Sequence, residues 1–513
     1  MAMKRLAIAC CLLVCLVAVG TPVATAHSPP QSAPAHSPAS PSAAYQTGDL
    51  LVDDPLGCVD GVCHDDRLNV SQADGLTDRE LELLIDRSMA RVELLRGERF
   101  ESDVPVRVTD PETFSREELT PNRSASEFNR WNDQVWKALF IVGDNTSSET
   151  AITDTLTGSV NGLYSPTRDE IVIVTETPDA PRISEGTLIH ELTHALQDQR
   201  YDLAAERFRG DTQDQDLAVT GLYEGVAGYI EARYRQRCDD QWRCFDTRPS
   251  NGDGGPANRG ILMTVLQPYS NGPAYVHEIV TTEGWEGIDE RMATPPKTTT
   301  ETIHRESVDR QPIDLADTAT DGWERYPQQG RNGAEVAGEA SIFVMFWYQA
   351  ATNGADTVDS DVLYETGDVP YNTRNYVAPP SEGWVADALY PYRRGDADGY
   401  VWALDWETAE DAAEFQRAYT AMLAAYDATE PESGIYVVDD GGFSGAYAVA
   451  VDGTRVTVVH APTRAGLFEL RPTLDPAATT TESVPGFGVG SALVALAVAL
   501  FGSATLAGRR RSN

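Results

Sequence analysis

The chain has very little lysine. Only Lys4, Lys137 and Lys297 occur among its 513 residues, so arginine supplies nearly all of the 40 basic side chains, against 79 acidic ones. The net charge is −39 and no segment carries a basic stripe, which argues against nucleic acid as a partner. A wholly disordered acidic chain is also excluded, because hydrophobic residues make up 41% of the sequence.

The acidic excess with almost no lysine resembles the composition of proteins from extremely halophilic archaea. A dense carboxylate surface stays hydrated and self-repelling where concentrated salt screens charge over short distances. The length suffices for two or three domains, or for one large domain with appendages.

Residues 1–26 have the pattern of a secretory signal peptide. Two basic residues precede an apolar run, and Ala24-Thr25-Ala26 follows as a cleavage site. Residues 27–48 are mostly Pro, Ser and Ala and predict a disordered spacer, so folding is expected to begin near Asp49.

The C-terminal end predicts a membrane attachment. Residues 487–508 are apolar and uncharged, which is enough to span about 30 Å of hydrocarbon, and the Arg-rich tail 509–513 is expected to stay cytoplasmic. The Thr-rich linker 471–486 ends in Pro-Gly before Phe487, and this arrangement resembles the PGF-CTERM sorting signal of haloarchaeal surface proteins. The resemblance implies recognition by an archaeosortase and replacement of the helix by a lipid anchor.

Four cysteines remain after removal of the signal peptide: Cys58, Cys63, Cys238 and Cys244. An even number in an extracellular chain predicts disulfides, for which three pairings are possible. The sequence-local pairs Cys58–Cys63 and Cys238–Cys244 are favoured, because each closes a tight loop. A cysteine-rich zinc site is the competing interpretation, and the separation of the two pairs along the chain argues against it.

Glycosylation acceptor triplets begin at Asn69, Asn122 and Asn145. Such triplets are common by chance, so about half of them are expected to be used.

Hydrophobic periodicity and turn residues predict a mixture of helices and strands. The predicted helices cover 76–95, 128–140, a stretch after Pro181, 216–237, 261–267, 275–282, 337–351 and 407–426. The apolar helix 337–351 is too short to span a membrane and is expected to lie in the core. The predicted strands cover 104–108, 160–164, 170–175, 399–404, 435–438, 446–451 and 454–459. Of these, 160–164 and 170–175 are expected to pair, and the last three are expected to form a small terminal sheet, with Asp452-Gly453 as a hairpin turn.

The most informative motif is His190-Glu191-Leu192-Thr193-His194. It lies in a stretch without Pro or Gly that predicts a helix, and residues four apart on a helix share a face. The rings of His190 and His194 are therefore expected to point at one place, with Glu191 beside them. Zinc hydrolases use this arrangement, with two His ligands and a carboxylate that acts as a base.

A catalytic zinc site needs a third protein ligand and one open position. Glu224 is the best candidate, because it lies 30 residues after His194 on the next predicted helix, followed by small residues that permit close approach to the motif helix. Glu231, seven residues later on the same face, is the second candidate, and its alternative interpretation is a plain surface glutamate.

A His-Glu-x-x-His helix with a downstream Glu on a second helix resembles the gluzincin type of metallopeptidase. A group of secreted zincin-like proteins is more similar still, over about residues 162–426. The residues that carry this closer resemblance are His190 to Gln199, Glu224 to Ala227, and Trp406 with Ala412 and Phe415.

The resemblance implies that His190, His194 and Glu224 bind Zn²⁺ and that Glu191 is the base. It also implies an α+β fold, in which a zincin-like domain over 49–310 combines a small sheet with the motif helix. A C-terminal α/β extension over 311–470 is expected to pack on it.

One position departs from the gluzincin pattern. Gluzincins often carry an acidic residue four positions after the third ligand, where it orients a histidine, but this chain has Gly228 there. Asp198 and Asp202 are candidates to take its place.

The developing oxyanion of a hydrolytic reaction needs a further hydrogen-bond donor. The candidates are His304, Tyr269 and Tyr275, all after the second helix, and His304 is the preferred one. For each of them, a packed amphipathic side chain without a catalytic role is the alternative.

These features predict an exported, membrane-anchored surface protein that hydrolyses peptide bonds in a peptide or protein substrate. The rival interpretation is a structural or adhesive surface glycoprotein whose metal site is silent or only stabilising. An amidase or cell-wall hydrolase would share the metal chemistry and differ only in substrate.

Overall fold

The computed structural model describes residues 54–118, 126–157, 162–238, 240–245, 258–306 and 311–474. The predicted signal peptide, spacer, apolar C-terminal helix and arginine tail lie outside these residues, as do Asn122 and residues 475–486 of the Thr-rich linker. Within the described ranges, no helix has the length and apolar character needed to cross a bilayer.

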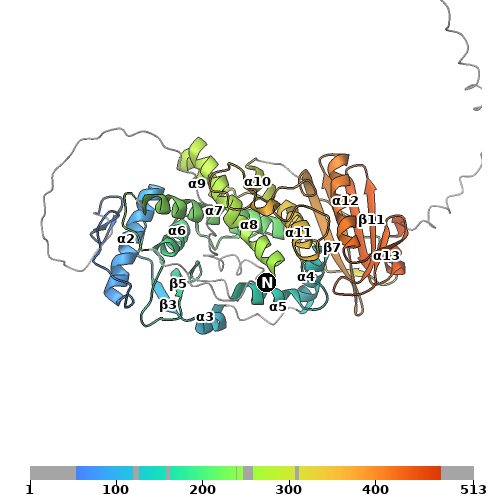
Figure 1. The fold of residues 1–513 in the computed structure, drawn as a ribbon, viewed down its shortest axis with the longest axis horizontal. Coiled ribbons are helices and arrows are strands. Elements are labelled where there is room, and N and C mark those ends of the chain that lie inside the picture. The colour runs from blue at the N-terminus through green and yellow to red at the C-terminus, as the bar shows by residue number, and fades with distance from the viewer. Residues whose placement is uncertain are drawn as a thin grey trace, which may run out of the picture.

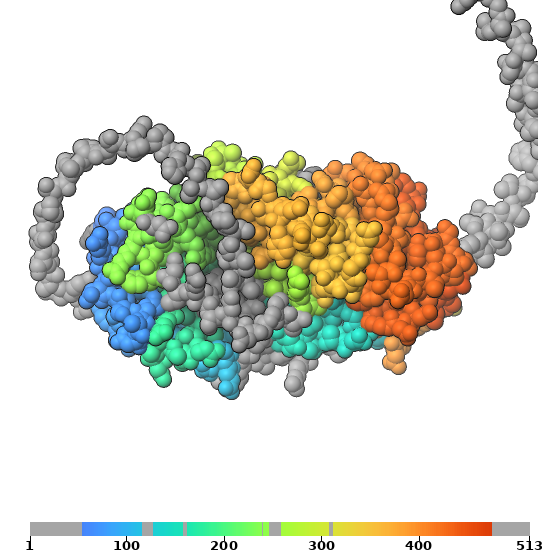
Figure 2. All heavy atoms as spheres, in the orientation of Figure 1, coloured from blue at the N-terminus to red at the C-terminus, as the bar shows by residue number. Residues whose placement is uncertain are grey.

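The described chain runs from one end of an elongated body to the other (Figure 1). A helical part with a small sheet comes first, and a larger sheet flanked by helices follows. Figure 2 shows the same outline in space-filling form, with the C-terminal described part at the end opposite to the first described residues. The presence of both helices and separate sheets confirms the predicted α+β class.

The small sheet has three strands in the order β3, β5, β4. Strands β4 (Gly162–Ser165) and β5 (Glu170–Val174) form an antiparallel hairpin, as predicted, and β3 (Val106–Thr109) pairs with β5 in parallel. Asp169 takes the left-handed conformation that the tight turn of the hairpin requires, with φ of 51°. Strand β4 is an edge of this sheet and packs beside the helix that carries the histidine motif.

That helix is α6 (Glu185–Tyr201), and it is buried almost throughout its first thirteen residues. It begins at Ser184, whose side chain accepts a hydrogen bond from the backbone N–H of Thr187, and it ends at Asp202 in the left-handed conformation. Helices α2 (Asp78–Arg96) and α7 (Gln213–Cys238) pack against it.

A buried ion network joins α2 to the start of α6. The carboxylate of Glu185 lies 2.9 Å from a guanidinium nitrogen of Arg87 and 2.6 Å from one of Arg91, and all three side chains are buried. Tyr234 of α7 also donates a hydrogen bond to the same carboxylate. The position of α6 is therefore fixed from two neighbouring helices.

Helix α8 (Arg259–Thr282) is a single helix, although the sequence predicted two separate segments with a break between them. Pro268 and Pro273 lie inside it, and each removes a backbone donor. The helix continues because its middle is buried against α7, where Gly225 meets Gly272 backbone to backbone. A Cβ on Gly225 would lie 2.5 Å from the carbonyl oxygen of Gly272.

This contact corrects one sequence-based expectation. The small residues after Glu224 were expected to allow close approach to the motif helix. In the structure Gly225 and Gly228 instead face α8, where a Cβ on Gly228 would lie 2.9 Å from the ring of Pro273. The two glycines therefore permit close packing of α7 on α8, and they do not face α6.

The larger sheet has seven strands in the order β6, β7, β8, β12, β11, β10, β9, and all neighbours are antiparallel. The sequence predicted β8, β10, β11 and β12 but placed only the last three in a small terminal sheet. It missed β7, whose alternation is obscured because it is buried on both faces over much of its length. The strands are β6 (Glu324–Arg325), β7 (Trp384–Arg394), β8 (Ala397–Trp406), β9 (Thr429–Glu432), β10 (Ile435–Val438), β11 (Gly445–Asp452) and β12 (Arg455–Ala461).

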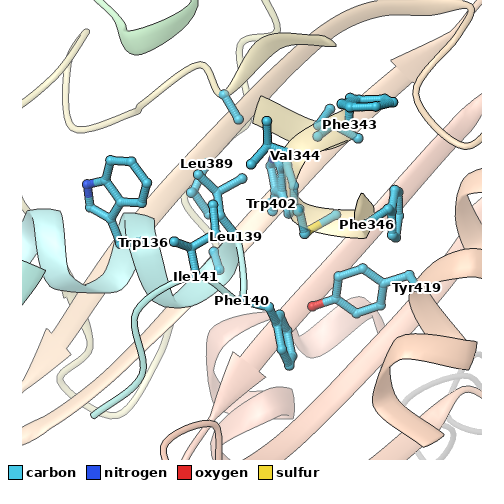
Figure 3. Close-up of a cluster of buried hydrophobic side chains, with 14 of the residues drawn as sticks. Trp136, Leu139, Phe140, Ile141, Phe343, Val344, Phe346, Leu389, Trp402 and Tyr419 are labelled. Atoms are coloured by element: carbon cyan, nitrogen blue, oxygen red, sulfur yellow. The ribbon is translucent and has the colours of Figure 1, made fainter. Parts of the chain in front are cut away.

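The largest hydrophobic core lies between this sheet and the helices α4 (Ser126–Ala138), α11 (Gly338–Asn353) and α12 (Ala409–Ala424). Figure 3 shows Trp136 of α4, Phe346 of α11, Trp402 of β8 and Tyr419 of α12 converging there. The core combines residues from both sides of the predicted division at residue 310. Segment 337–351 is thus a core helix, as expected.

The remaining described elements are short or peripheral. They are β1 (Cys58–Val59), β2 (Val62–Cys63), α3 (Pro111–Glu118), α5 (Ser148–Thr157), α9 (Gly284–Ala293), α10 (Thr299–His304) and α13 (Arg464–Leu470), with 3₁₀ turns at Glu206–Phe208, Val362–Tyr364 and Pro472–Leu474.

The structure contains both sequence-local disulfides. Cys58 is bonded to Cys63 across the two-stranded β1–β2 ribbon, and Cys238 at the end of α7 is bonded to Cys244. The cysteine-rich zinc site is thereby excluded for these four residues, since both sulfur pairs are already bonded.

Candidate metal centre

Three predicted ligands meet between α6 and α7. His190, His194 and Glu224 each offer one ligand atom, and these atoms all lie within 4.8 Å of one another. One oxygen of Glu224 lies 3.1 Å from Nε2 of His190 and 3.1 Å from Nε2 of His194. All three side chains are buried. The sequence prediction of the ligand set is consistent with this geometry.

The donor set suits zinc. Two imidazole nitrogens and one carboxylate oxygen are the ligands of many catalytic zinc sites, whereas calcium and magnesium prefer oxygen ligands alone. Both imidazole rings present Nε2 toward the common point, so a cation placed there would meet nitrogen lone pairs.

The other nitrogen of each ring is held by a separate side chain. Nδ1 of His190 lies 3.2 Å from Glu231, and Nδ1 of His194 lies 3.0 Å from the side-chain oxygen of Gln197. Because both partner atoms are acceptors, each Nδ1 can keep its hydrogen when a cation takes the place of the proton at Nε2, so that Nε2 can act as the ligand. Gln197 is itself oriented by donating to the backbone carbonyl of Tyr223.

Glu231 therefore does not lie in the position of the third ligand, for which it was the second candidate in the sequence analysis. It stands behind His190, on the side of the ring away from Glu224, and Arg235 pairs with its second oxygen at 2.6 Å. It fills the orienting role that Gly228 leaves open, one helical turn later. Sequence reasoning missed Gln197, although its position three residues after His194 puts it on the same face of α6.

The two aspartates proposed for that role are engaged elsewhere. Asp198 accepts hydrogen bonds from the hydroxyl of Tyr164 and the backbone N–H of Leu203. Asp202 ends helix α6 and is exposed. Neither orients a motif histidine, because the side chains of Glu231 and Gln197 already occupy both Nδ1 positions.

Glu191 lies beside the ligands and is completely buried. Neither of its carboxylate oxygens has a hydrogen bond of normal geometry within the described part of the chain. Burial raises the pKa of Glu191 to about 7, while the neighbouring imidazoles and the backbone of Tyr164 act in the opposite direction. A buried carboxyl group that titrates near neutral pH is suited to take up and release a proton.

The ligand side chains also shift one another's pKa. Burial opposes charge on His190, but hydrogen bonds to Glu224 and Glu231 raise its pKa to about 10. Burial opposes charge on Glu224 too, and the two imidazoles nevertheless hold its pKa at about 2. A concentration of opposite charge in a buried place is the electrostatic setting in which a cation can replace protons.

Among the three candidate oxyanion donors, the structure brings Tyr269 to the centre. Its hydroxyl donates to Glu224 at 2.9 Å, and its ring lies over that of His190. His304 instead pairs with Glu339 at 2.7 Å, at the start of α11. Tyr275 is buried and interacts with Arg291, and burial raises its pKa to about 12. The preferred donor of the sequence analysis therefore has another partner.

Two of the three glycosylation triplets can be placed. Asn69 and Asn145 are both exposed, as an attached glycan would require. Their use remains a prediction.

One family model, described as "Domain of unknown function (DUF8575)", matches residues 324–471. This range begins with β6 and ends just after α13, so it contains the complete seven-stranded sheet but none of the three candidate ligands. The chain matches no curated protein and no solved structure.

Proposed function

We propose that the protein is a zinc-dependent peptidase whose metal is held by His190, His194 and Glu224. The observation that carries the proposal is the convergence of these three ligand atoms within 4.8 Å, with each imidazole held at Nδ1 by an acceptor. Zinc, when bound, supplies Lewis acidity to the reaction.

The side chains around the ligands have separate tasks in this proposal. Glu191 takes a proton from the attacking water and passes it to the leaving amine, for which its raised pKa is favourable, as is the fact that no side chain of the described residues holds its carboxylate by a hydrogen bond. Tyr269 is the candidate donor to the developing oxyanion, since its hydroxyl already lies 2.9 Å from Glu224.

The likeness of the motif to gluzincins supports a peptide as the substrate class. Strand β4 packs beside α6, and the backbone of its Tyr164 lies close to Glu191. All four residues of this strand are buried, so its edge is not itself open for a peptide to add a strand.

A stabilising metal without catalysis is the second candidate. Its support is the burial of the ligands, with His190 at 2%, His194 at 6% and Glu224 at 1% exposure, because structural zinc sites are closed. Glu191 argues for catalysis, since a purely structural site has no use for a buried carboxylate that no side chain of the described residues holds by a hydrogen bond.

One experiment separates the two candidates. The purified protein is incubated in concentrated salt with a casein-type substrate, before and after chelation, and its fold is followed by circular dichroism. A peptidase cleaves the substrate and loses that activity on chelation while it stays folded. If chelation unfolds the protein and no peptide is ever cut, the stabilising metal is the correct account.

We further propose that this peptidase acts outside the cell, attached at its C-terminus to the membrane by the apolar helix or by a lipid anchor added through an archaeosortase. The support comes from the sequence of the two ends and from the pair of disulfides, which suit an oxidising environment. Mass spectrometry of the mature protein tests it, since sorting predicts loss of residues 1–26 and of the C-terminal helix.

A further inference from the structure

A second site lies far along the chain from the metal centre. A cavity of 470 Å³ opens where α4 meets one end of the seven-stranded sheet. Its walls come from the turn between β7 and β8, the loop between β10 and β11, the end of β12 and the start of α13. Most of these residues fall in the range that the family model matches, and none of them is a residue of the metal centre.

The cavity holds a buried lysine in a chain that has only three. The ammonium group of Lys137 donates to Asp144 at 2.6 Å, and the side chain is 6% exposed. Asp144 also lines the cavity, so the charge of Lys137 is balanced within the wall itself. The lysine therefore leaves little positive charge to attract an anion.

Two other wall residues contain hydrogen-bond acceptors without partners. Nε2 of His460 lies 3.4 Å from the carbonyl oxygen of Ser444, and since a carbonyl only accepts, Nδ1 is left as an acceptor. Nδ1 of His460 and the side-chain oxygen of Gln134 both lack a hydrogen bond in the described residues. His460 is 1% exposed and Gln134 is 4% exposed. A buried acceptor without a partner is costly unless a ligand supplies a donor.

The charged residues of the lining favour a cation. Four aspartates line the cavity against Lys137 and Arg464. Asp144 is paired with Lys137, Asp398 is paired with Arg130 from outside the lining, and Arg464 is paired with Glu432, so Asp396 and Asp439 supply the surplus negative charge. Asp396 and Asp439 are exposed members of the lining. The acidity of the whole chain would by itself account for exposed carboxylates, so the buried acceptors and the cavity are the observations that point to a ligand.

We propose that this cavity binds a small organic cation that carries several N–H donors, of the amine or guanidine class. Such a ligand would donate to the acceptors of the wall and neutralise the surplus carboxylates. The volume lies within the range of about 300–1,000 Å³ that is usual for small-molecule sites. The site is independent of the proposed peptidase activity.

Isothermal titration calorimetry of the full chain, at fixed salt, tests this proposal with putrescine as the probe. Putrescine is expected to bind with one molar equivalent. Its permethylated analogue has the same charge but no N–H donor, and it is expected to bind at least about five-fold more weakly, since one hydrogen bond contributes about 1 kcal/mol. The dianion succinate is expected not to bind.

Variants locate the site. Gln134→Met removes an acceptor at similar volume and is expected to weaken putrescine binding about five-fold, as one hydrogen bond implies. Asp439 is exposed, so Asp439→Asn provides a second variant that is expected to fold normally. This variant is also expected to bind putrescine more weakly. Asp356→Asn, which is exposed outside the cavity lining, is expected to leave the affinity unchanged.

Three outcomes would overturn the proposal. They are the absence of saturable putrescine binding, equal affinity for the permethylated analogue, and saturable binding of succinate in place of putrescine. If Asp439→Asn and Asp356→Asn bound putrescine with equal affinity, the assignment of the binding site to this cavity would be overturned.

Discussion

Glu231 holds His190 from behind: its carboxylate lies 3.2 Å from Nδ1, while Nε2 of the same ring lies 3.1 Å from Glu224. Helix α7 thus supplies both the third candidate ligand and the group that orients the first one. The seven-residue separation makes this possible, because two turns of a helix return to the same face.

The first prediction concerns this orienting contact. Glu231→Ala is expected to lower zinc affinity by about 10- to 100-fold, the usual effect of removing a group that orients a metal ligand. Glu231→Gln retains an acceptor and is expected to restore most of the loss. Competition with a chromophoric chelator measures both affinities.

Glu410→Ala is the control for this measurement, since Glu410 is 72% exposed in its side chain and pairs with Arg417. An unchanged affinity in Glu231→Ala would show that the contact has no role in binding the metal.

The second prediction distinguishes the role of the base, Glu191, from the roles of the metal ligands. Glu191→Gln preserves the size of the side chain but cannot accept the proton, so peptide cleavage is expected to fall by at least about 10²-fold. The zinc content, measured by mass spectrometry of the purified variant, is expected to remain at the wild-type value. Retained cleavage in a zinc-loaded variant would remove Glu191 from the mechanism.

The third prediction concerns stability. Glu185→Gln leaves Arg87 and Arg91 buried without a counter-charge, and its expected cost is about 3–5 kcal/mol in the free energy of unfolding. Glu82→Gln removes an ion pair with Arg79 whose side chains are 59% and 61% exposed, and its expected cost is below about 1 kcal/mol. Denaturant titration of the two variants compares them, and equal values would contradict the role given to the buried network.

The fourth prediction concerns pH. Asp214, at the start of α7, is buried beside Asp387 and Glu339, and one of its oxygens has no hydrogen bond in the described residues. Burial raises its pKa to about 7, although Thr299 donates to the other oxygen. Because the folded state keeps the proton longer than the unfolded state, this group makes the protein less stable as pH rises from about 4 to 7.

Asp214→Asn removes that dependence. The variant is expected to gain stability relative to the wild type as pH rises through this window, by at most about 4 kcal/mol for a shift of roughly three pK units. Melting temperatures at several pH values measure the difference, with the exposed Asp356→Asn as control. A constant difference between wild type and Asp214→Asn across the window would contradict the assignment.

The convergence of the three candidate ligands was largely predictable from the sequence because they lie on two regular helices. A four-residue spacing fixes the relation of His190 to His194 once α6 is assumed, and Glu224 follows on the next helix. The orienting residues were harder to identify. The choice between Glu231 as a ligand and Glu231 as a support depends on which nitrogen of His190 it faces, and this follows from the packing of α7 on α6.

His304 shows where sequence reasoning fails for a single residue. It was chosen because it follows the second helix in a candidate loop, but the buried carboxylate of Glu339, 35 residues further along, binds its ring. No local sequence pattern predicts a partner so far along the chain. Tyr269 was identified only as one of several aromatic residues, and its position depends on α8 remaining continuous through Pro268.

The larger sheet could be predicted only in part. The Asp452-Gly453 turn predicts the β11–β12 hairpin. In the structure Asp452 pairs with Arg455, close to this turn, as the prediction requires. The pairing of β12 with β8 joins residues some 50 positions apart, such as Asp405 and Arg455, and it depends on the core that α11 and α12 build against the sheet.

The central claim is that His190, His194 and Glu224 hold a zinc ion. Anomalous diffraction from crystals of the protein, collected on both sides of the zinc absorption edge, tests it most directly. The account predicts a single strong peak about 2.0–2.2 Å from Nε2 of both histidines and from a carboxylate oxygen of Glu224. A zinc-soaked crystal with no peak between these three side chains would contradict it.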